Sequence, residues 1–329
     1  MVSDLAQTKN KPDLVIDIGS ICGDYSASRL FSGVATWRIS EDGEFHNRLG
    51  VQKLEKVFEM SERRFFSALL SSAGLSRSHY YAELKEEIGE LMVPNLPLSN
   101  TYISSRLAQD IPKGSVLHLS ILNSLRNMDF FKLDKSILVS SNVGGFGIDG
   151  ALSTAIGQSI ACPDRTVFCL IGDLAFFYDM NSLGIRHLGG NLRVLLVNNG
   201  EGVEFRLNNR LESQWGDDTD AYIAAKGHNG SAELWVKSRG LVYLSASNKE
   251  EFEESFREFI NSDPGHFSGK SVVFEVFTSV LDEQHALHHI RSANRPVRQD
   301  PKPTVKQQVA KVAPESVKKA YRKAVKGHA

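Results

Sequence analysis

The chain has 329 residues, of which 41% are hydrophobic and 23% are charged, and its formal net charge is −1. This composition is ordinary for a water-soluble globular protein, and the length suits two domains or one large α/β domain. No apolar run approaches the roughly 20 residues of a membrane span, and residues 1–13 lack the apolar core of a secretory signal, so we expect neither a membrane partner nor secretion.

The three cysteines, Cys22, Cys162 and Cys169, lack the spacing of metal ligands, and their odd number argues against a disulfide framework. We therefore expect a cytoplasmic protein with reduced thiols. Residues 291–329 contain eleven Lys and Arg against two acidic residues, a charge of +9, which leaves −10 for residues 1–290. Such a basic segment can dock on the acidic body, on a partner subunit or on a polyanion, or stay solvated. We expect the last, and no nucleic-acid partner.

Residues 1–95 are predicted to form a partial central domain of Rossmann-like type. Apolar runs with β-branched residues at 13–19 and 33–40 predict two strands. The stretch 51–73 is predicted to be helical, and a second helix is expected over 79–92. The segment NLPLSN (95–100) then marks a boundary, with Ser99 or Asn100 as the N-cap of the next helix.

Residues 96–290 are predicted to form a doubly wound parallel sheet, because strand and helix patterns alternate regularly along them. Strands are expected at 115–121, 136–141, 166–171, 193–197, 241–247 and 271–277. Helices are expected at 101–109, 151–161, 176–188, around Tyr222 and at 249–260. About six parallel strands need helices on both faces, so the fold class is α/β. Residues 291–329 are expected to be a flexible tail with a short basic helix at 313–327.

The stretch 165–205 carries the strongest chemical signal of the chain. A buried strand ends at Gly172–Asp173, a helix follows, and a second buried strand ends at an Asn-Asn-Gly turn containing Asn199. Asp173 and Asn199 are 199 − 173 = 26 residues apart, about one βαβ crossover, so both are expected at carboxyl ends of parallel strands, where ligands bind. A carboxylate, an amide oxygen and a backbone carbonyl suit Mg²⁺. The positive end of the helix near Leu174 favours a diphosphate.

These motifs resemble those of thiamine-diphosphate (ThDP) enzymes. Gly-Asp, one crossover and Asn-Asn are similar to the diphosphate-binding motif of that family. The segment SSNVGGFGIDGALSTAIG (140–157) resembles the SNRGASGIDG segment of the 2-succinyl-5-enolpyruvyl-6-hydroxy-3-cyclohexene-1-carboxylate synthases of menaquinone biosynthesis. The segment IGDLAFFYDMNSL (171–183) is also close to the pattern of these synthases, and PDLVIDIG and LNSLRNM match more weakly.

The resemblance implies that ThDP and Mg²⁺ are the cofactors. The implied metal ligands are the side chains of Asp173 and Asn199 and the main-chain oxygen of Glu201. Ile148 would be the apolar support that bends ThDP into its V shape. The other implied cofactor-binding residues lie in the same turns and on the first helix turns: Ser124, Gly147, Gly172, Leu174 and Ala175.

Three departures from the synthase pattern bear on activity. The synthases have substrate-gripping arginines at the positions of Met128 and Val143, and Glu204 replaces a residue that is usually apolar. A bidentate arginine-carboxylate contact cannot be replaced by methionine or valine, although Arg126, Arg206 or Arg210 could compensate. Finally, ThDP enzymes need a pyrimidine-binding domain with an activating glutamate, which we expect on a partner chain in a homo- or hetero-oligomer.

The leading hypothesis is therefore a ThDP- and Mg²⁺-binding subunit of a 2-oxo acid decarboxylase or carboligase that is completed by a pyrimidine-domain-bearing chain. The alternative is a catalytically degenerate relative with a structural or regulatory role. A nicotinamide-dependent enzyme is a third alternative. The loop NVGGFG lacks the G-x-G-x-x-G spacing, and no acidic residue follows a second strand as that fingerprint requires.

Overall fold

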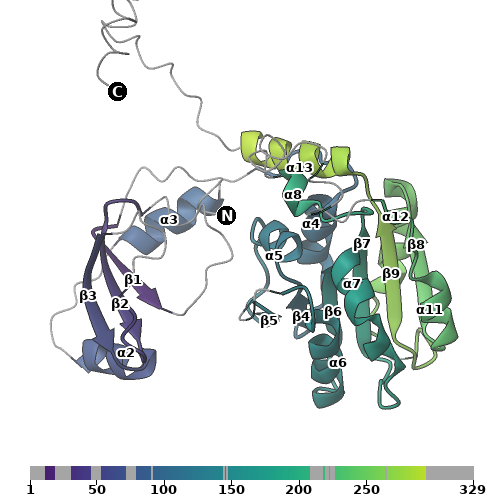
Figure 1. The fold of residues 1–329 in the computed structure, drawn as a ribbon, viewed down its shortest axis with the longest axis horizontal. Helices are drawn as coiled ribbons and strands as arrows, with labels where there is room; N and C mark the ends of the chain where they lie inside the picture. Colours follow the sequence, from purple (N-terminus) through teal and green to yellow (C-terminus); the bar gives the residue numbers. More distant parts are fainter. Residues whose placement is uncertain are drawn as a thin grey trace, which may run out of the picture. The chain divides into compact units, whose positions relative to one another are not determined.

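The computed structural model describes residues 12–18, 31–45, 53–71, 79–89, 92–143, 145, 147–207, 218, 222, 227–263 and 265–293 (Figure 1). The described residues contain two parallel sheets. One has three strands in the order β1-β2-β3, and the other has six in the order β5-β4-β6-β7-β9-β8. Among the described residues, no helix has the length and apolar character needed to cross a membrane.

The three-stranded sheet occupies the N-terminal part of the described chain. Its elements are β1 (Leu14–Ile18), β2 (Ala35–Ser40), β3 (Lys53–Glu59), α2 (Glu62–Ser71) and α3 (Tyr80–Gly89). The guanidinium of Arg38 on β2 is buried and donates to Asp17 Oδ2 on β1 at 2.8 Å. The helix predicted over 51–73 is wrong in its first half, because residues 53–59 pair in parallel with β2. The pairing of β3 along β2 outweighs the helical preference of its charged residues.

The six-stranded sheet positions the candidate site. Its strands are β4 (Val116–Leu119), β5 (Leu138–Ser141), β6 (Val167–Gly172), β7 (Leu192–Asn198), β8 (Val242–Ala246) and β9 (Val272–Phe277). All five pairings between neighbouring strands are parallel. Their carboxyl ends therefore lie at one edge of the sheet, and β6 lies between β4 and β7.

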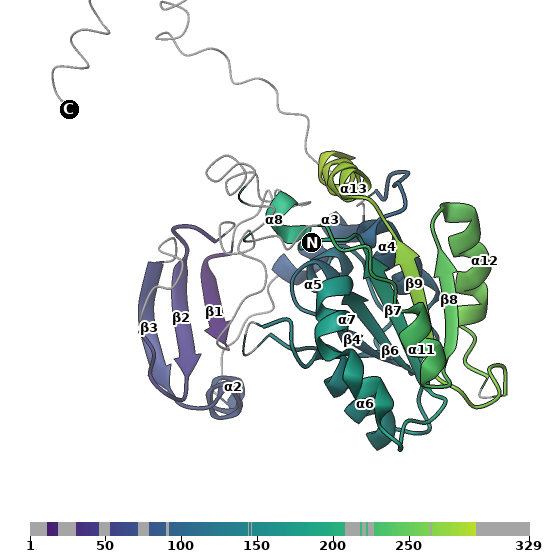
Figure 2. The same ribbon diagram turned by 45° about the vertical axis from the view of Figure 1, so that its right-hand side comes forward.

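Helices cover both faces of this sheet (Figures 1 and 2). The helices of this part of the chain are α4 (Asn100–Asp110), α5 (Asn123–Met128), α6 (Ala151–Ala161), α7 (Asp173–Asp179), the 3₁₀ helix η1 (Met180–Gly184), α8 (Glu204–Leu207), α11 (Glu233–Ser238), α12 (Lys249–Phe259) and α13 (Val280–Ala293). Of these, α8 and α13 lie at one end of the strands and not on a face of the sheet (Figure 1). Successive residues of a strand serve opposite layers: Phe168 packs with α4 and α12, whereas Cys169 packs with α6, α7 and α11. The predicted doubly wound α/β class is confirmed.

Local capping explains where several helices start. Ser99 caps α4 as predicted, accepting a hydrogen bond from the Tyr102 N–H at 3.2 Å, and Asn248 caps α12 in the same way through Glu251. The predicted helix over 176–188 is shorter than expected, because α7 ends at Asp179 and continues as η1. Helix α11 was not predicted. The residues around Tyr222 and the tail from residue 294 lie outside the described part of the chain, and the division at residue 95 stays a prediction.

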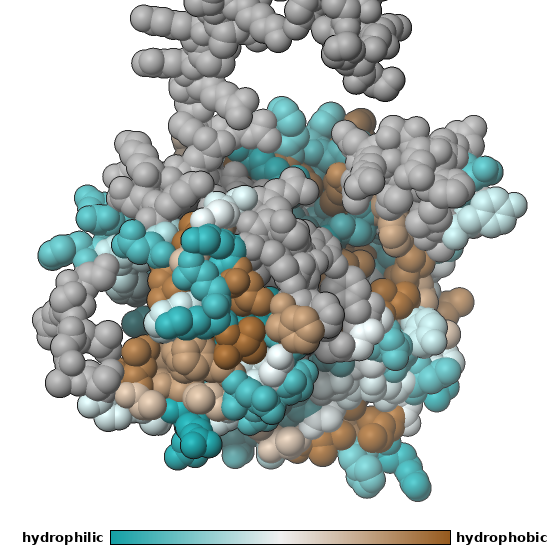
Figure 3. All heavy atoms as spheres, turned by 60° about the vertical axis from the view of Figure 1, so that its left-hand side comes forward, coloured by the Kyte–Doolittle hydropathy of each residue, from teal (hydrophilic) through white to brown (hydrophobic). Residues whose placement is uncertain are grey.

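Large apolar side chains reach the surface at several described positions. Figure 3 shows such apolar residues interspersed with hydrophilic ones on the face it draws. Leu138 and Val139, on the edge strand β5, are 56% and 47% exposed. Single exposed apolar residues are ordinary on protein surfaces and define no site by themselves.

Candidate functional site

Asp173 lies at the carboxyl end of β6, on the first turn of α7. Its Oδ2 accepts hydrogen bonds from the backbone N–H of Asn199 at 3.0 Å and of Gly200 at 2.7 Å. Asn199 directly follows β7, the neighbour of β6 in the sheet. The structure therefore brings the two residues together at adjacent strand ends, as predicted from their spacing.

The Asp173 carboxylate is almost fully enclosed. The residue is 3% exposed, and its Oδ1 accepts a further hydrogen bond from the N–H of Leu174 at 2.7 Å. Burial raises the pKa of Asp173 above its ordinary value, while the hydrogen bonds from Leu174, Gly200 and Asn199 and the nearby imidazole of His228 oppose this shift. A divalent cation would hold this carboxylate in its charged form, since positive charge lowers a carboxyl pKa.

The side-chain oxygen of Asn199 is a buried polar atom that could bind a ligand. Asn199 Oδ1 is buried and has no hydrogen-bond partner among the described residues. A buried polar atom without a partner is costly, and such atoms commonly face an ion, a water or a ligand. A Cβ added at Gly172 would meet no atom within 4 Å, so there is open space beside this end of β6. A carboxylate and the amide oxygen of a residue whose backbone N–H donates to that carboxylate are ligand types that suit a hard cation such as Mg²⁺.

Glu201 is the third predicted ligand, through its main-chain oxygen. That oxygen accepts a hydrogen bond from the Val203 N–H at 3.0 Å, and a carbonyl oxygen has a second lone pair. The side chain is 3% exposed: its Oε1 accepts from Arg206 Nε at 3.2 Å, and its Oε2 has no partner in the described part of the chain. No group of three or more His, Cys, Asp or Glu suited to a metal occurs among the described residues. The predicted set of one carboxylate, one amide and one carbonyl is not of that kind.

His228 contacts the site and was missed by sequence reasoning. Its Nε2 lies 3.2 Å from Asp173 Oδ2, and its ring meets Phe177 edge-on at 5.4 Å between centroids. The N–H of Gly230 donates to His228 Nδ1 at 3.3 Å, which assigns the proton to Nε2 and makes Nε2 the donor to Asp173. His228 is 55 residues from Asp173 in sequence, and no local spacing signals a contact at that separation.

The glycine-rich loop before α6 is held by Asn142. Its Nδ2 donates to the Gly150 carbonyl at 3.2 Å and to Thr154 Oγ1 at 2.9 Å. Gly150 has φ +77°, which favours glycine, and a Cβ at Gly147 would lie 2.2 Å from Asp149 Oδ1. Ile148, the predicted apolar support, is 37% exposed, so its side chain is accessible to a bound molecule.

Three other predicted cofactor-binding residues, Ser124, Leu174 and Ala175, lie on α5 and α7, and Met128, where the synthases have an arginine, lies on α5. Ser124 on α5 is 2% exposed. The side chain of Ala175 lies in the core, and the predicted amide donor of Leu174 is directed at Asp173. Met128 is buried in the core between α4 and the sheet, where an arginine would lose its hydration. The absence of an arginine at that position therefore has a packing reason.

Two of the three arginines that could compensate form ion pairs with acidic side chains. Arg126 on α5 forms an ion pair with Glu204 on α8, and Arg206 pairs with Glu201. With its amide oriented by hydrogen bonding, Asn123 donates to Glu204 Oε2 at 2.7 Å and accepts from the Glu204 N–H at 3.1 Å. Arg210 lies outside the described residues.

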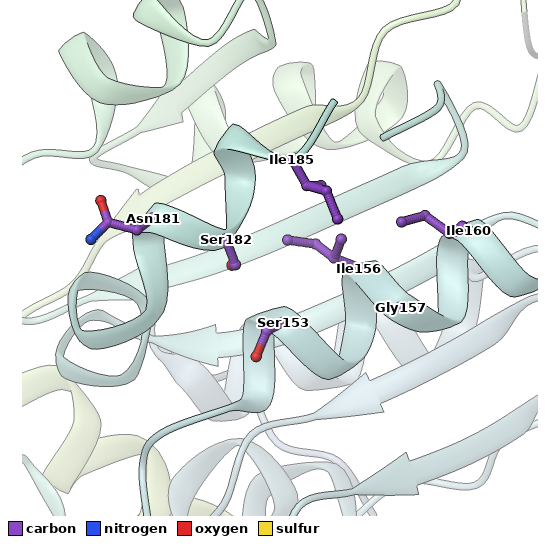
Figure 4. Close-up of a pocket in the computed structure, with 7 residues that line it drawn as sticks. All are labelled: Ser153, Ile156, Gly157, Ile160, Asn181, Ser182 and Ile185. Carbon is purple, nitrogen blue, oxygen red and sulfur yellow. The ribbon is translucent and has the colours of Figure 1, made fainter. Parts of the chain in front are cut away.

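A groove of about 330 Å³ lies between α6 and η1 (Figure 4). Figure 4 shows the side chains of Ile156, Ile160 and Ile185 pointing toward one another across it. The groove contains none of the predicted cofactor-binding residues, and its lining offers no charged group. It is therefore not a second candidate for a diphosphate.

Comparison with known proteins identifies the class. Residues 124–270 match the family described as "Thiamine pyrophosphate enzyme, C-terminal TPP binding domain". These residues span the whole candidate site, from α5 to the loop before β9. Residues 124–270 are therefore similar to the C-terminal, TPP-binding domain of thiamine pyrophosphate enzymes. The prediction of thiamine diphosphate as the cofactor is confirmed at the level of the family.

The chain resembles 2-succinyl-5-enolpyruvyl-6-hydroxy-3-cyclohexene-1-carboxylate synthase in particular. It is 32% identical to the Bacteroides fragilis synthase over 279 residues, which is 83% of this chain and 48% of the relative. Identity to the Bacteroides thetaiotaomicron synthase is 31% over 243 residues, 74% of this chain and 42% of the relative. Identity to the Desulfotalea psychrophila synthase is 42% over 104 residues, 32% of this chain and 19% of the relative. The chain spans about half the length of the first of these relatives.

Proposed function

We propose that this chain binds ThDP through Mg²⁺ and forms the diphosphate half of the active site of a 2-oxo acid decarboxylase or carboligase. The observation that carries the proposal is the buried Asn199 Oδ1 without a partner among the described residues, in a residue whose backbone N–H donates to the Asp173 carboxylate. The two side chains come from adjacent strand ends at the edge where α/β sheets bind ligands.

In this proposal Asp173, Asn199 and the main-chain oxygen of Glu201 hold the cation. The chemistry that ThDP would supply there is an electron sink for the decarboxylation of a 2-oxo acid. The chain orients its own ligands first: the N–H groups of Asn199 and Gly200 fix the Asp173 carboxylate between two strand ends. The loop held by Asn142 carries Ile148 to the surface, where it would support the cofactor.

We also propose that a pyrimidine-binding domain with the activating glutamate completes the site from a partner chain, in a homo- or hetero-oligomer. The family description names this domain as the C-terminal part of an enzyme, which supports the presence of other domains in the working assembly. A small 2-oxo acid is the proposed substrate.

The test is calorimetric titration of the full chain with ThDP, with Mg²⁺ present or with EDTA. The residues proposed to hold the diphosphate of ThDP all lie in this chain. We therefore expect weak Mg²⁺-dependent binding of ThDP by the chain alone and tighter binding when the pyrimidine-domain-bearing partner is present. Asp173→Ala should abolish the Mg²⁺-dependent binding, whereas Asp263→Ala, which changes an exposed turn, should not. Absence of any Mg²⁺-dependent binding in the wild-type chain would contradict the proposal.

A catalytically degenerate relative with a structural or regulatory role is the second candidate. It is favoured by the burial of Met128 in the core and by the pairing of Arg126 and Arg206 with acidic residues. In cells, an Asp173→Ala chain that kept full biological function would support this candidate. Loss of function in a variant that remained folded would favour the enzyme.

A further inference from the structure

The chain contains two Asn-Gly pairs, Asn199–Gly200 and Asn229–Gly230. In such a pair the backbone nitrogen of the glycine can attack the side-chain amide of the asparagine, because glycine has no Cβ that hinders the approach. The attack closes a five-membered succinimide ring and releases ammonia. The two pairs offer the same chemistry, so their surroundings decide which of them reacts.

The Asn199–Gly200 pair is held in place by hydrogen bonds. The N–H groups of both residues donate to Asp173 Oδ2, at 3.0 and 2.7 Å, and the side-chain oxygen of Asn199 is buried. The carbonyl of Gly200 also accepts from the Gly227 N–H at 3.2 Å. The Asn199 amide would have to leave its buried position to meet the Gly200 nitrogen, so we expect this pair to react slowly.

The Asn229–Gly230 pair lies in the loop before α11, where both residues are exposed. The Gly230 N–H donates to His228 Nδ1 at 3.3 Å, so the nitrogen that would attack is hydrogen-bonded to an imidazole. The other ring nitrogen, Nε2, lies 3.2 Å from Asp173 Oδ2, and this contact orients the ring. A nucleophile, a base within hydrogen-bond reach and a third group that orients the base form the arrangement found in nucleophilic catalysis.

The base and the attacking residue are both fixed by further contacts. The ring of His228 meets Phe177 edge-on, with 5.4 Å between centroids, and the Gly230 carbonyl accepts from Asn198 Nδ2 at 2.8 Å. The side chain of Asn229, in contrast, is on the surface. Only this exposed side chain has to rotate for the ring to close.

We propose that Asn229–Gly230 is a site of self-modification, at which His228 acts as the general base that converts Asn229 to aspartate and isoaspartate. A bond forms between the Gly230 nitrogen and Asn229 Cγ, and the Cγ–Nδ2 bond breaks. The proton of the Gly230 nitrogen passes to His228 Nδ1 and then to the departing nitrogen, which leaves as ammonia. Water opens the ring at either carbonyl, and opening at the main-chain carbonyl gives isoaspartate.

The modification would change the loop that contacts Asp173. Both products place a carboxylate at position 229, and isoaspartate lengthens the backbone between His228 and Gly230 by one carbon atom. Because these two residues are hydrogen-bonded across position 229, the longer backbone disturbs the contact of His228 with Asp173. The chain thus carries a slow covalent change beside the candidate site that requires no second protein.

The experiment follows both Asn-Gly pairs in one sample. The full chain is incubated at neutral pH and physiological temperature, and trypsin then releases residues 227–237, which contain Asn229, and residues 194–206, which contain Asn199. Tandem mass spectrometry measures the fraction of each asparagine converted to the acid. A protein-isoaspartate methyltransferase with a labelled methyl donor detects isoaspartate. Conversion should be faster at Asn229 than at Asn199, and equal or slower conversion at Asn229 would contradict the inference.

His228→Phe tests the role of the base, because it keeps an aromatic ring next to Phe177 and removes the acceptor of the Gly230 N–H. Conversion at Asn229 should slow at least about tenfold, since a positioned general base typically contributes roughly 10²- to 10⁴-fold. A loosened loop would have the opposite effect, because a freer backbone closes the ring more easily. His228→Ala should slow the conversion as well, and it serves as the second variant if His228→Phe does not fold.

His266→Phe is the matched control. His266 also contacts a carboxylate, that of Glu258, and its ring also meets a phenylalanine edge-on, that of Phe267. This variant should keep the wild-type rate of conversion at Asn229. Circular dichroism of each variant checks that the fold is intact.

Unfolding separates the role of the fold from that of the local sequence. In concentrated urea the wild-type chain and His228→Phe should be converted at equal rates, because the hydrogen bond to Nδ1 is lost. Equal rates in the folded proteins, or a difference that persists in urea, would overturn the inference. None of these measurements depends on ThDP, so the proposed function is tested separately.

Discussion

Two neighbouring asparagines, Asn198 and Asn199, end the same strand but have opposite surroundings. Asn198 Nδ2 donates to Glu275 Oε1 and to the Gly230 carbonyl, both at 2.8 Å. Asn199 Oδ1 has no partner among the described residues, although it is buried beside Asp173. A strand alternates its side chains between the two faces of the sheet, so adjacent identical residues enter different environments.

The acidic residues of the two environments differ in the same way. Glu275 is completely buried, and its oxygens accept from three groups besides Asn198: the Ser231 hydroxyl, the Ala232 N–H at both oxygens, and the Tyr243 hydroxyl. Asp173 accepts from the backbone N–H of Asn199, whose amide oxygen has no partner among the described residues, and Asp173 follows Gly172, which has open space beside it. A hydrogen-bond network in which every buried polar group has a partner stabilises the fold. A buried acceptor without a protein partner can instead contact a ligand.

The largest expected effect is a loss of stability when the hydrogen-bond network around Glu275 is broken. Glu275→Ala leaves several buried donors without an acceptor, so the free energy of unfolding should fall by more than about 3 kcal/mol. Urea denaturation followed by circular dichroism measures this change. Glu275→Gln, which keeps one acceptor, should cost less, and a loss below about 1 kcal/mol in the alanine variant would contradict the structural role.

A third buried carboxylate, Glu283, makes stability depend on pH. Its oxygens accept from the Asn100 N–H at 2.9 and 3.1 Å, and from the Thr278 hydroxyl at 2.8 Å. Burial raises its pKa from 4.5 to about 7, with these hydrogen bonds opposing. The folded chain therefore binds this proton more tightly than the unfolded chain does, so its stabilising contribution is complete below pH 4.5 and is lost as the pH rises through about 7.

The free energy of unfolding should accordingly fall by up to about 3 kcal/mol between pH 4.5 and 8. In Glu283→Gln this part of the pH dependence should disappear. Urea unfolding at several pH values measures both effects. If the free energy of unfolding changed with pH by the same amount in the wild-type chain and in Glu283→Gln, the pKa of Glu283 would not be raised in the folded chain.

The asparagine pair gives the sharpest contrast. Asn198→Ala should lower stability by about 1 to 3 kcal/mol, because Glu275 loses a buried donor, with little change in Mg²⁺-dependent ThDP binding. Asn199→Ala should leave stability nearly unchanged, because it removes an acceptor that has no partner among the described residues. The same substitution should weaken the Mg²⁺-dependent binding of ThDP about tenfold, which corresponds to about 1.4 kcal/mol for the loss of one metal ligand. Thermal unfolding and calorimetry on both variants measure the two effects. Equal effects of both substitutions would remove the distinction.

The smallest effect is expected at His228. Its hydrogen bond to Asp173 is 3.2 Å long, and the ring is partly exposed, so His228→Ala should reduce stability by about 1 kcal/mol or less. Mg²⁺-dependent binding should persist, because Asp173 keeps its three backbone donors. A loss of binding as complete as in Asp173→Ala would instead make His228 a ligand of the site.

The local sequence pattern was sufficient to predict part of the fold. It failed for a segment whose structure depends on pairing with another strand. The β-branched apolar runs predicted all six strands of the large sheet, of which β4, β6, β7 and β9 are buried on both faces while the edge strand β5 is largely exposed. The segment 53–59 was predicted as helix because its charged residues are typical of helices, and only its pairing with β2 makes it a strand. Helix α11 was missed because it has only six residues, too few for a clear helical pattern. Its N-cap residue, Ala232, donates its backbone N–H to Glu275, a distant residue that the local pattern does not reveal.

The sequence by itself determined that Asp173 and Asn199 end two consecutive parallel strands, since turn residues follow two apolar runs one crossover apart. Only the tertiary structure decided what surrounds them. Asp173 contacts His228, which is 55 positions away, and Asn198 contacts Glu275, which is 77 positions away. Arg126 pairs with Glu204, which is 78 positions away. Such contacts depend on the strand order β4-β6-β7-β9, which short-range periodicity does not encode.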